Sequence, residues 1–394
     1  MFTLDGWIEL DGHRLPPEAI ESILGAGAGD LSRCGGEFLL KWSGYCARDW
    51  LGIVPGPCPP GTVLKDGRLC GYIHPAATGS ELFDGDRALS KQTVLDGIDA
   101  AIRTAVALRA DEGVVTAFSG GVDSAFVAKL ADLPCVAIGL EGSHDLTEAR
   151  NAANSMGLSC ECIVFSVREV EQALITVIRD LYDIAKSTPP DDLPGFGTGY
   201  ADGSCAIEEM ESRADAGTCG SGKEIPCPVI RRSPSPVDVA VGAAQYCIAR
   251  WAREQGYRRI LSGQGADELF GGYAKYLTTS DPERSMGLDF AALLRQVHRD
   301  QVLVAPSGAR FSFPYLDVRV VRVAGRIPAA EKIFPTRKHP LREVALRHVP
   351  AGIAWKEKKA MQYGSGFAKV LANMARHNGY KRSVQRYIDY TGGR

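Results

Sequence analysis

Two glycine-rich segments of this sequence combine the residue types that bind phosphate groups and metal ions. The first reads FSGGVDSA, at residues 118–125, and the second reads SGQGADELFGGY, at residues 262–273. Residues 114–118 are apolar and β-branched, as in a buried strand, and residues 125–130 have helical spacing. The first segment is therefore a strand-to-helix turn, where the N–H groups at the start of the helix favour an anion.

The side chains of this first turn fit a metal-bound polyphosphate. Gly120 and Gly121 let the backbone approach an anion closely. Ser119 and Ser124 add hydroxyl donors. Asp123 would repel a bare phosphate, so its presence indicates a bridging metal ion. We expect this loop to bind pyrophosphate together with Mg²⁺.

The second segment also leaves an expected strand, at residues 259–261, and enters a helix. It is expected beside the first turn, because the carboxyl ends of parallel strands form one edge of the sheet, where open α/β sheets bind ligands. Asp267 supplies a second carboxylate in position to share the metal ion with Asp123.

Alternating strand and helix patterns place both turns in a doubly wound parallel sheet of the α/β class. The alternation breaks at residues 186–236, which are rich in Gly, Pro, Ser, Asp and Cys and predict a flexible insert. From Asp267 onward the pattern is mostly helical. The remaining expected elements are helices at 91–108, 146–156, 168–185 and 237–255, and strands at 135–140 and 160–167.

Length and composition narrow the class of protein. The 394 residues suit two domains, and the many glycines and prolines of residues 1–90 predict a small β-rich domain ahead of a larger one at 91–394. No apolar run approaches the ~20 residues of a membrane span and no signal pattern begins the chain, so we expect a cytoplasmic protein without a membrane partner. The net charge of −2 carries no nucleic-acid signature, and eleven cysteines, an odd number, fit free thiols in a reducing compartment.

Together, the two segments resemble the motifs of the asparagine synthetase family. SGGVDS is similar to the pyrophosphate loop of the ATP pyrophosphatases. SGQGADELFGGY is similar to the signature of the asparagine synthetase branch, which also includes β-lactam synthetases. FPYLD, at residues 313–317, resembles the family's PFLD segment, and AWKEK, at residues 354–358, resembles the segment with its essential lysine. The likeness covers most of residues 90–370, apart from the insert.

The amino-terminal part resembles the closing strands of the family's Ntn-type glutaminase domain. The matching segments are GEF at residues 36–38 and ARDWLGI at residues 47–53. Those glutaminases use a nucleophilic cysteine directly after the initiator methionine, whereas this sequence has Phe2 there and no counterpart of the first half of the domain. A phenylalanine ring cannot attack an amide. We therefore expect a truncated glutaminase-like domain, with ammonia supplied freely or by a separate glutaminase subunit.

The resemblance implies the ATP pyrophosphatase fold, similar to the adenine nucleotide α-hydrolases, with a helical carboxyl-terminal part. It also implies a two-step ligase reaction with ATP and Mg²⁺, and a possible homodimer. A small carboxylate, aspartate by default, attacks the α-phosphorus of ATP to give an acyl-adenylate and pyrophosphate. Ammonia or an amine then displaces AMP and leaves an amide, which is asparagine when aspartate is the acid.

The same resemblance assigns roles to individual residues. Catalysis is assigned to Lys358, Asp123 and Gln264, with Lys358 balancing charge on pyrophosphate or on the tetrahedral intermediate, and Mg²⁺ is assigned to Asp123 and Asp267. The implied nucleotide site comprises Ser119, Gly120, Gly121, Asp123, Ser124, Gly139, Leu140, Ser262 and Gly263. The implied substrate site comprises Gly265, Asp267, Glu268, Gly271, Gly272 and Arg342.

Two departures from the family pattern leave alternatives open. Gln264 stands where most members carry Glu, and a carboxamide cannot take a proton at neutral pH. Either the amine needs no base from this position, or another group such as Glu268 supplies it. Arg310 and Ser312 stand where the family often has Glu and Arg, which leaves the acceptor acid open.

Two other functions stay open from sequence. Thirteen Lys/Arg against three acids from Arg337 onward would also suit a tRNA-modifying ATP pyrophosphatase, although nucleic acid is not the expected partner. A non-catalytic nucleotide-binding subunit would suit the residues at positions 2 and 264.

Overall fold

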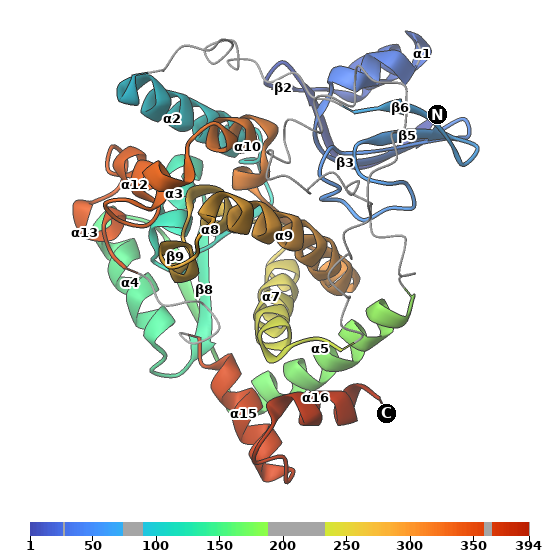
Figure 1. Ribbon diagram of the computed structural model, residues 1–394. Helices are drawn as coiled ribbons and strands as arrows, with labels where there is room; N and C mark the ends of the chain where they lie inside the picture. Colours follow the sequence, from blue (N-terminus) through green and yellow to red (C-terminus); the bar gives the residue numbers. More distant parts are fainter. Residues whose placement is uncertain (27, 74–89, 188–232, 358–364, 394) are drawn as a thin grey trace.

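The computed structural model describes residues 1–26, 28–73, 90–187, 233–357 and 365–393 (Figure 1). Within these ranges the strands form two sheets, one antiparallel and one parallel. Most of the predicted insert and the predicted catalytic Lys358 lie outside the described residues.

The amino-terminal sheet has the strand order β2-β1-β3-β4-β5-β6 and is antiparallel throughout. Alternate residues of its strands, such as Ile8 and Phe38, pack with Ile20 of helix α1 (Pro17–Ala26) in a small core of their own. Helix α1, of ten residues, was not anticipated from the sequence. The strands of this sheet are β1 (Phe2–Leu10), β2 (His13–Arg14), β3 (Gly35–Trp42), β4 (Tyr45–Arg48), β5 (Thr62–Lys65) and β6 (Arg68–Tyr72).

The second sheet is parallel and has the strand order β11-β10-β7-β8-β9. The α/β class and the doubly wound parallel sheet predicted from sequence are thus confirmed. Strands β8 and β10 have the predicted bounds, whereas the three-residue β11 was not anticipated. The strands are β7 (Val114–Ala117), β8 (Cys135–Leu140), β9 (Cys160–Phe165), β10 (Arg259–Leu261) and β11 (Arg310–Ser312).

Helices cover both faces of this parallel sheet, as Figure 1 shows for β8, which lies between α4 and α7. The carboxyl-terminal part is helical, as expected. The helices of the first half are α2 (Lys91–Ala107), α3 (Val122–Ala131), α4 (His144–Met156) and α5 (Val167–Ser187). The later helices are α7 (Pro236–Glu254), α8 (Ala266–Phe270), α9 (Pro282–Val304), α10 (Val318–Gly325), α11 (Ala329–Ile333), α12 (His339–Ala345), α13 (Ala351–Ala354), α15 (Phe367–His377) and α16 (Val384–Gly392). In the described ranges, no helix is both long and apolar enough to cross a membrane.

The strand order creates a switch point between β7 and β10. From β7 the chain moves outward through β8 to β9, and it then returns to the other side of β7 to add β10 and β11. Ligands of open α/β sheets bind where the order reverses, outside the carboxyl ends of the strands. Both glycine-rich turns follow the two strands that flank this point.

The segment that follows β4 packs into the core of the parallel sheet. Trp50, Leu51 and Ile53, which follow β4, pack in the same buried cluster as residues of α2, β7 and α10. The amino-terminal sheet is therefore in direct contact with the layer that carries the switch point (Figure 1).

Candidate active site

The two glycine-rich turns lie against each other. A Cβ added at Gly263 would come within 2.9 Å of the backbone N of Ser124 and 3.1 Å of the Cβ of Asp123. The second turn thus rests on the first turn of α3, and a side chain at residue 263 would separate them. This is the proximity expected from the strand order.

The first turn leaves the start of helix α3 open. Gly121 is the N-cap of α3 and makes no side-chain capping bond. The N–H of Ser119 donates to Ser124 Oγ at 3.1 Å, and Ser124 Oγ donates to the carbonyl of Gly121 at 3.2 Å, so the serines shape the loop. Gly120 has a φ of 72°, and a Cβ there would meet the carbonyl oxygen of Glu148 at 2.7 Å. Backbone N–H groups at such a helix start favour an anion.

Asp123 and Asp267 converge on one cation, the ammonium group of Lys338. Lys338 Nζ lies 2.7 Å and 2.8 Å from the two carboxylate oxygens of Asp123 and 2.7 Å from Asp267 Oδ1. The side chain of Lys338 is only 7% exposed and that of Asp123 10%, whereas that of Asp267 is 42% exposed. Burial alone would lower the pKa of Lys338, but the two carboxylates raise it above its usual value, so the amine is charged.

The two carboxylates suit Mg²⁺ by donor type. Mg²⁺ prefers oxygen ligands and is commonly held by one or two protein carboxylates together with substrate phosphates. The described part of the chain has no group of three or more His, Cys, Asp or Glu side chains that could hold a metal. Asp123 and Asp267 would therefore hold the ion only with phosphate oxygens as additional ligands, as in a metal–nucleotide complex.

Residues of the FPYLD segment contact both turns. The hydroxyl of Tyr315 donates to the carbonyl of Asp123 at 3.2 Å, and its ring meets Phe270 edge-on at 6.3 Å. Leu316 fills the space beside Gly265, where a Cβ would lie 2.9 Å from Leu316 Cδ2. The φ of Gly265 is 100°, a conformation that L side chains rarely adopt.

Two further glycines of the second segment lie where the chain turns beside the ion pairs. A Cβ at Gly272 would collide with Asp267 Oδ1 and with Lys338 Cε. Gly271 has a φ of 75° and ends helix α8, where its N–H donates to the carbonyl of Asp267. Gly271 and Gly272 together thus allow the backbone to turn in close contact with Asp267 and Lys338.

Glu268 is buried beside the ion pairs. Its side chain accepts the hydroxyl of Tyr273 at 2.5 Å, and the residue is 7% exposed. Burial raises the pKa of Glu268 to about 7. The amide of Gln264 is held differently, because Gln264 Oε1 accepts Gln245 Nε2 at 3.4 Å and the N–H of Gln264 donates to Ser262 Oγ at 3.2 Å.

Arg342 bonds the backbone next to the predicted catalytic segment. Its Nε donates to the carbonyl of Arg337 at 2.8 Å, and its Nη1 donates to the carbonyls of Ala354 and Lys356 at 2.7 Å and 3.0 Å. Lys356 in turn pairs with Glu148, whose carbonyl lies against Gly120. The chain leading to residue 358 therefore starts beside the first turn.

Gly139 and Leu140 end β8, the strand next to β7. The N–H of Leu140 donates to the carbonyl of Ser365 at 3.1 Å, and a Cβ at Gly366 would meet Leu140 Cδ1 at 2.7 Å. The backbone at residues 139–140 is therefore at the same carboxyl edge as both turns.

The roles of Lys338 and Tyr273 were not predicted from the sequence. Lys338 appeared only as one of many basic residues near the carboxyl end, and no local motif separates it from them. Its contact with Asp123 spans 215 residues of sequence. Tyr273 belongs to the second segment itself, but only the fold shows that its hydroxyl reaches Glu268.

Comparison with known proteins identifies relatives of this chain. The chain matches the profile of the family described as Asparagine synthase over residues 97–192, 228–310 and 288–390, ranges that include both turns. It is 28% identical over 316 residues to a putative glutamine-hydrolysing asparagine synthetase of Methanocaldococcus jannaschii, covering 69% of this chain and 49% of that relative.

It is 24% identical over 362 residues to the glutamine-hydrolysing asparagine synthetase B of Escherichia coli, covering 82% of this chain and 55% of the relative. It is 25% identical over 306 residues to the glutamine-hydrolysing asparagine synthetase of Homo sapiens, covering 72% of this chain and 44% of that relative. The chain thus spans about half the length of these curated relatives. The family match covers more than half of the chain and both of its glycine-rich turns, and the chain therefore belongs to the asparagine synthase family.

Proposed function

We propose that this chain is an ATP-dependent amide synthetase that forms an acyl-adenylate and then an amide, with aspartate as the default acid and asparagine as the product. The observation that carries the proposal is the convergence of Asp123 and Asp267, from two different strand ends, on one cation beside the start of α3. Family membership and the names of the relatives support asparagine as the product. No observation favours a tRNA-modifying pyrophosphatase.

The pyrophosphate part of ATP is assigned to the first turn. The open N-terminus of α3 and the glycines at 120 and 121 present N–H groups to phosphate oxygens, with hydroxyl support from Ser119 and Ser124. When bound, Mg²⁺ would neutralise charge on the phosphate oxygens, with Asp123 and Asp267 as its protein ligands.

We assign two lysines to the stabilisation of the negative charge that builds on the leaving pyrophosphate. Lys338 already lies between the metal-ligand carboxylates, and its raised pKa keeps it cationic. Lys358 is the second, by its position in the AWKEK segment. Arg342 acts through the backbone that leads to Lys358, in addition to the substrate role expected from sequence. Fixed cations aimed at developing charge lower the barrier, because they need no reorganisation during the step.

The remaining residues are assigned to adenine and to the acid. Backbone groups at 139–140 and 262–263 would hold adenine at the carboxyl edge of β8 and β10. The acid is assigned to the backbone of the second turn, at Gly265, Gly271 and Gly272, beside Asp267 and Glu268. Gln264 would contribute hydrogen bonds and no proton transfer.

Ammonia, free or from a separate glutaminase subunit, is the proposed nitrogen donor. We also assign residues 1–90 and 91–394 to a glutaminase-like β domain and a synthetase domain.

Product analysis tests the proposal. Purified protein with ATP, Mg²⁺, aspartate and ammonium should release AMP and pyrophosphate in equal amounts, together with asparagine. Asp123→Asn, which removes a metal ligand and a partner of Lys338, should abolish this release. ADP and inorganic phosphate as the nucleotide products would contradict the proposal, and a screen of other acids under the same conditions identifies the preferred carboxylate.

A further inference from the structure

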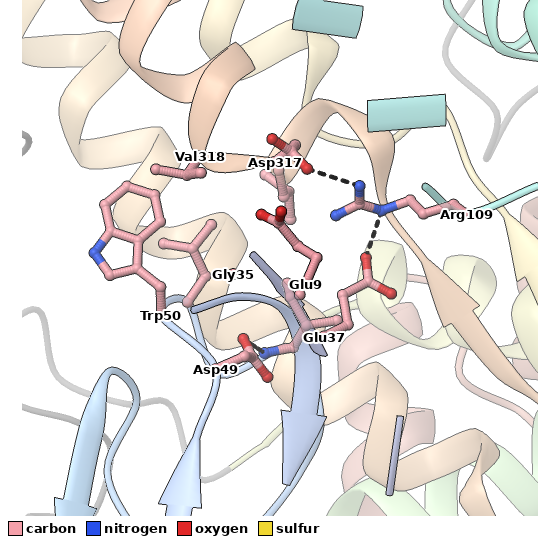
Figure 2. A pocket seen from close by; sticks show the side chains of 12 residues that line it. Glu9, Gly35, Glu37, Asp49, Trp50, Arg109, Asp317 and Val318 are labelled. Carbon is pink, nitrogen blue, oxygen red and sulfur yellow. Dashed lines mark hydrogen bonds and ion pairs between the residues drawn. The ribbon is translucent and has the colours of Figure 1, made fainter. Parts of the chain in front are cut away.

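Five charged side chains form a continuous buried chain of ion pairs between the amino-terminal sheet and the layer that carries the candidate site. In order of contact they are Glu37, Arg109, Asp317, Arg319 and Glu9, each 5% exposed or less. Figure 2 shows Arg109 between Asp317 and Glu37, with Glu9 and Asp49 lining the same small cavity. Two of these groups, Glu9 and Glu37, belong to strands β1 and β3.

Glu37 differs from Glu9 in the hydrogen-bond donors that its carboxylate accepts. The carboxylate of Glu37 accepts Arg109 Nε at 2.8 Å, Ser312 Oγ at 2.5 Å and the N–H of Phe313 at 3.1 Å. Three donors, all buried, thus meet one carboxylate, and two of them belong to the segment that begins at the end of β11.

That same segment touches both glycine-rich turns. The carbonyl of Ser312 accepts the N–H of Ser262 at 3.0 Å, at the start of the second turn. Three residues on, the hydroxyl of Tyr315 donates to the carbonyl of Asp123 in the first turn of α3. The path from Glu37 to each turn therefore consists of hydrogen bonds through one short stretch of chain, residues 312–315.

We propose that Glu37 is a positioning residue for the synthetase site, which fixes residues 312–315 so that the two turns keep their spacing. The amino-terminal sheet then contributes directly to the geometry of a site on the other sheet. This inference rests on the proposed function for its effect on turnover, but its effect on the turns stands on the contacts alone. Small displacements of a positioned group cost large factors in rate, which is why such support matters.

Stability alone does not test the proposal, because breaking any buried ion pair destabilises a protein. The matched control is Glu9→Gln. Glu9 is equally buried in the same chain of ion pairs, but it accepts Arg319 Nη2 at 2.9 Å and 3.0 Å and the N–H of Gly12 at 2.8 Å, with no bond to residues 312–315. In Glu37→Gln the amide NH₂ can face only Ser312 Oγ, which then accepts, and the remaining amide oxygen is uncharged. The bonds to Arg109 and to the N–H of Phe313 are therefore weaker, and residues 312–313 are held less firmly.

The experiment compares amide hydrogen exchange in the full chain, in peptides covering residues 119–125 and 262–267. In Glu37→Gln, exchange in both peptides should rise roughly tenfold, the factor expected when hydrogen bonds to a charged acceptor become bonds to a neutral one. In Glu9→Gln, the exchange rates of both peptides should stay within about twofold of the wild type, although global stability falls by a similar amount. The KM for ATP should rise in the first variant and not in the second.

The inference would be overturned if exchange in the two peptides rose equally in Glu37→Gln and Glu9→Gln, or if it changed in neither variant. If Glu37→Gln does not fold, Ser312→Ala decides, because it removes one bond to Glu37 and leaves the Arg109 pair intact. It should raise exchange in both peptides, and wild-type exchange there would count against the proposal. Exchange needs no turnover, so a wild-type protein that releases no AMP would refute the proposed function without affecting this result.

Discussion

Replacing Lys338 with methionine removes the cation on which the two carboxylates of the site converge. Methionine keeps most of the apolar stem, so the change is mainly one of charge. Asp123, with a side chain only 10% exposed, would be left as a buried carboxylate without its ammonium partner. Breaking a buried pair in this way costs ~3–5 kcal/mol, and the lower value applies because Asp267 is 42% exposed and partly screened by water.

A loss of about 3 kcal/mol corresponds to a fall of about 4 °C in Tm, taking ~2.1 cal/mol/K per residue for the unfolding entropy of the chain. Differential scanning calorimetry without Mg²⁺ gives the measurement. Added Mg²⁺ should restore part of the loss in the variant, because two adjacent carboxylates without an ammonium group attract a divalent cation. It should restore little in the wild type.

The control is Lys91→Met. Lys91 Nζ pairs with Glu343 at the same distance of 2.7 Å, but the lysine side chain is 66% exposed. An exposed pair contributes ~0–1 kcal/mol, so this variant should barely change Tm. If Lys338→Met proved no more destabilising than Lys91→Met, the description of a buried, charge-balanced site would be wrong.

Three further predictions test other parts of the site and the interface. Gly272→Ala forces a Cβ into the ion-paired side chains and should lower kcat/KM for ATP at least tenfold, which is about 1.4 kcal/mol. In the control Gly287→Ala nothing lies within 4 Å of the added Cβ, so kcat/KM should stay within about twofold of the wild type. Steady-state AMP release measures both. Arg342→Lys cannot reproduce a guanidinium that bonds three backbone carbonyls, so AMP release at saturating substrate should fall roughly tenfold (about 1.4 kcal/mol) while the unfolding transition stays cooperative. Burial, and then the neighbouring Arg48, lower the pKa of His298 to about 4, so its stabilising effect is complete above pH ~6.5 and is lost as the pH falls toward 4. Denaturant unfolding should therefore show the wild type losing about 3 kcal/mol more than His298→Asn between pH 7 and pH 4, and parallel curves would contradict this pKa shift.

Local sequence patterns predicted the central strands of the parallel sheet well where a strand is a continuous apolar run bounded by turn residues. CVAIGL, at residues 135–140, is such a run, and its bounds were predicted to the residue. The three residues of β11, Arg-Phe-Ser, carry no such pattern and pair only because β10 lies alongside. Helix α1 was missed because the abundant glycines and prolines around it obscure ten residues of helical spacing.

The site was predictable where chemistry depends on local backbone geometry. Glycines at 120 and 265 mark turns with positive φ, and their spacing from Asp123 and Asp267 follows from strand-to-helix geometry. Lys338 could not be placed in this way, because only tertiary packing brings it to the two carboxylates. The same holds for Glu37, whose partners Ser312 and Phe313 lie 275 and 276 residues away.

An oxygen-isotope experiment tests the central claim most directly. If the carboxylate of the acid attacks the α-phosphorus of ATP, one of its oxygens stays bonded to that phosphorus when the amide forms. Aspartate labelled with ¹⁸O in its side-chain carboxylate, incubated with the protein, ATP, Mg²⁺ and ammonium, should yield AMP that carries one ¹⁸O atom. Unlabelled AMP, or ¹⁸O in inorganic phosphate with ADP as the nucleotide product, would contradict the proposed acyl-adenylate.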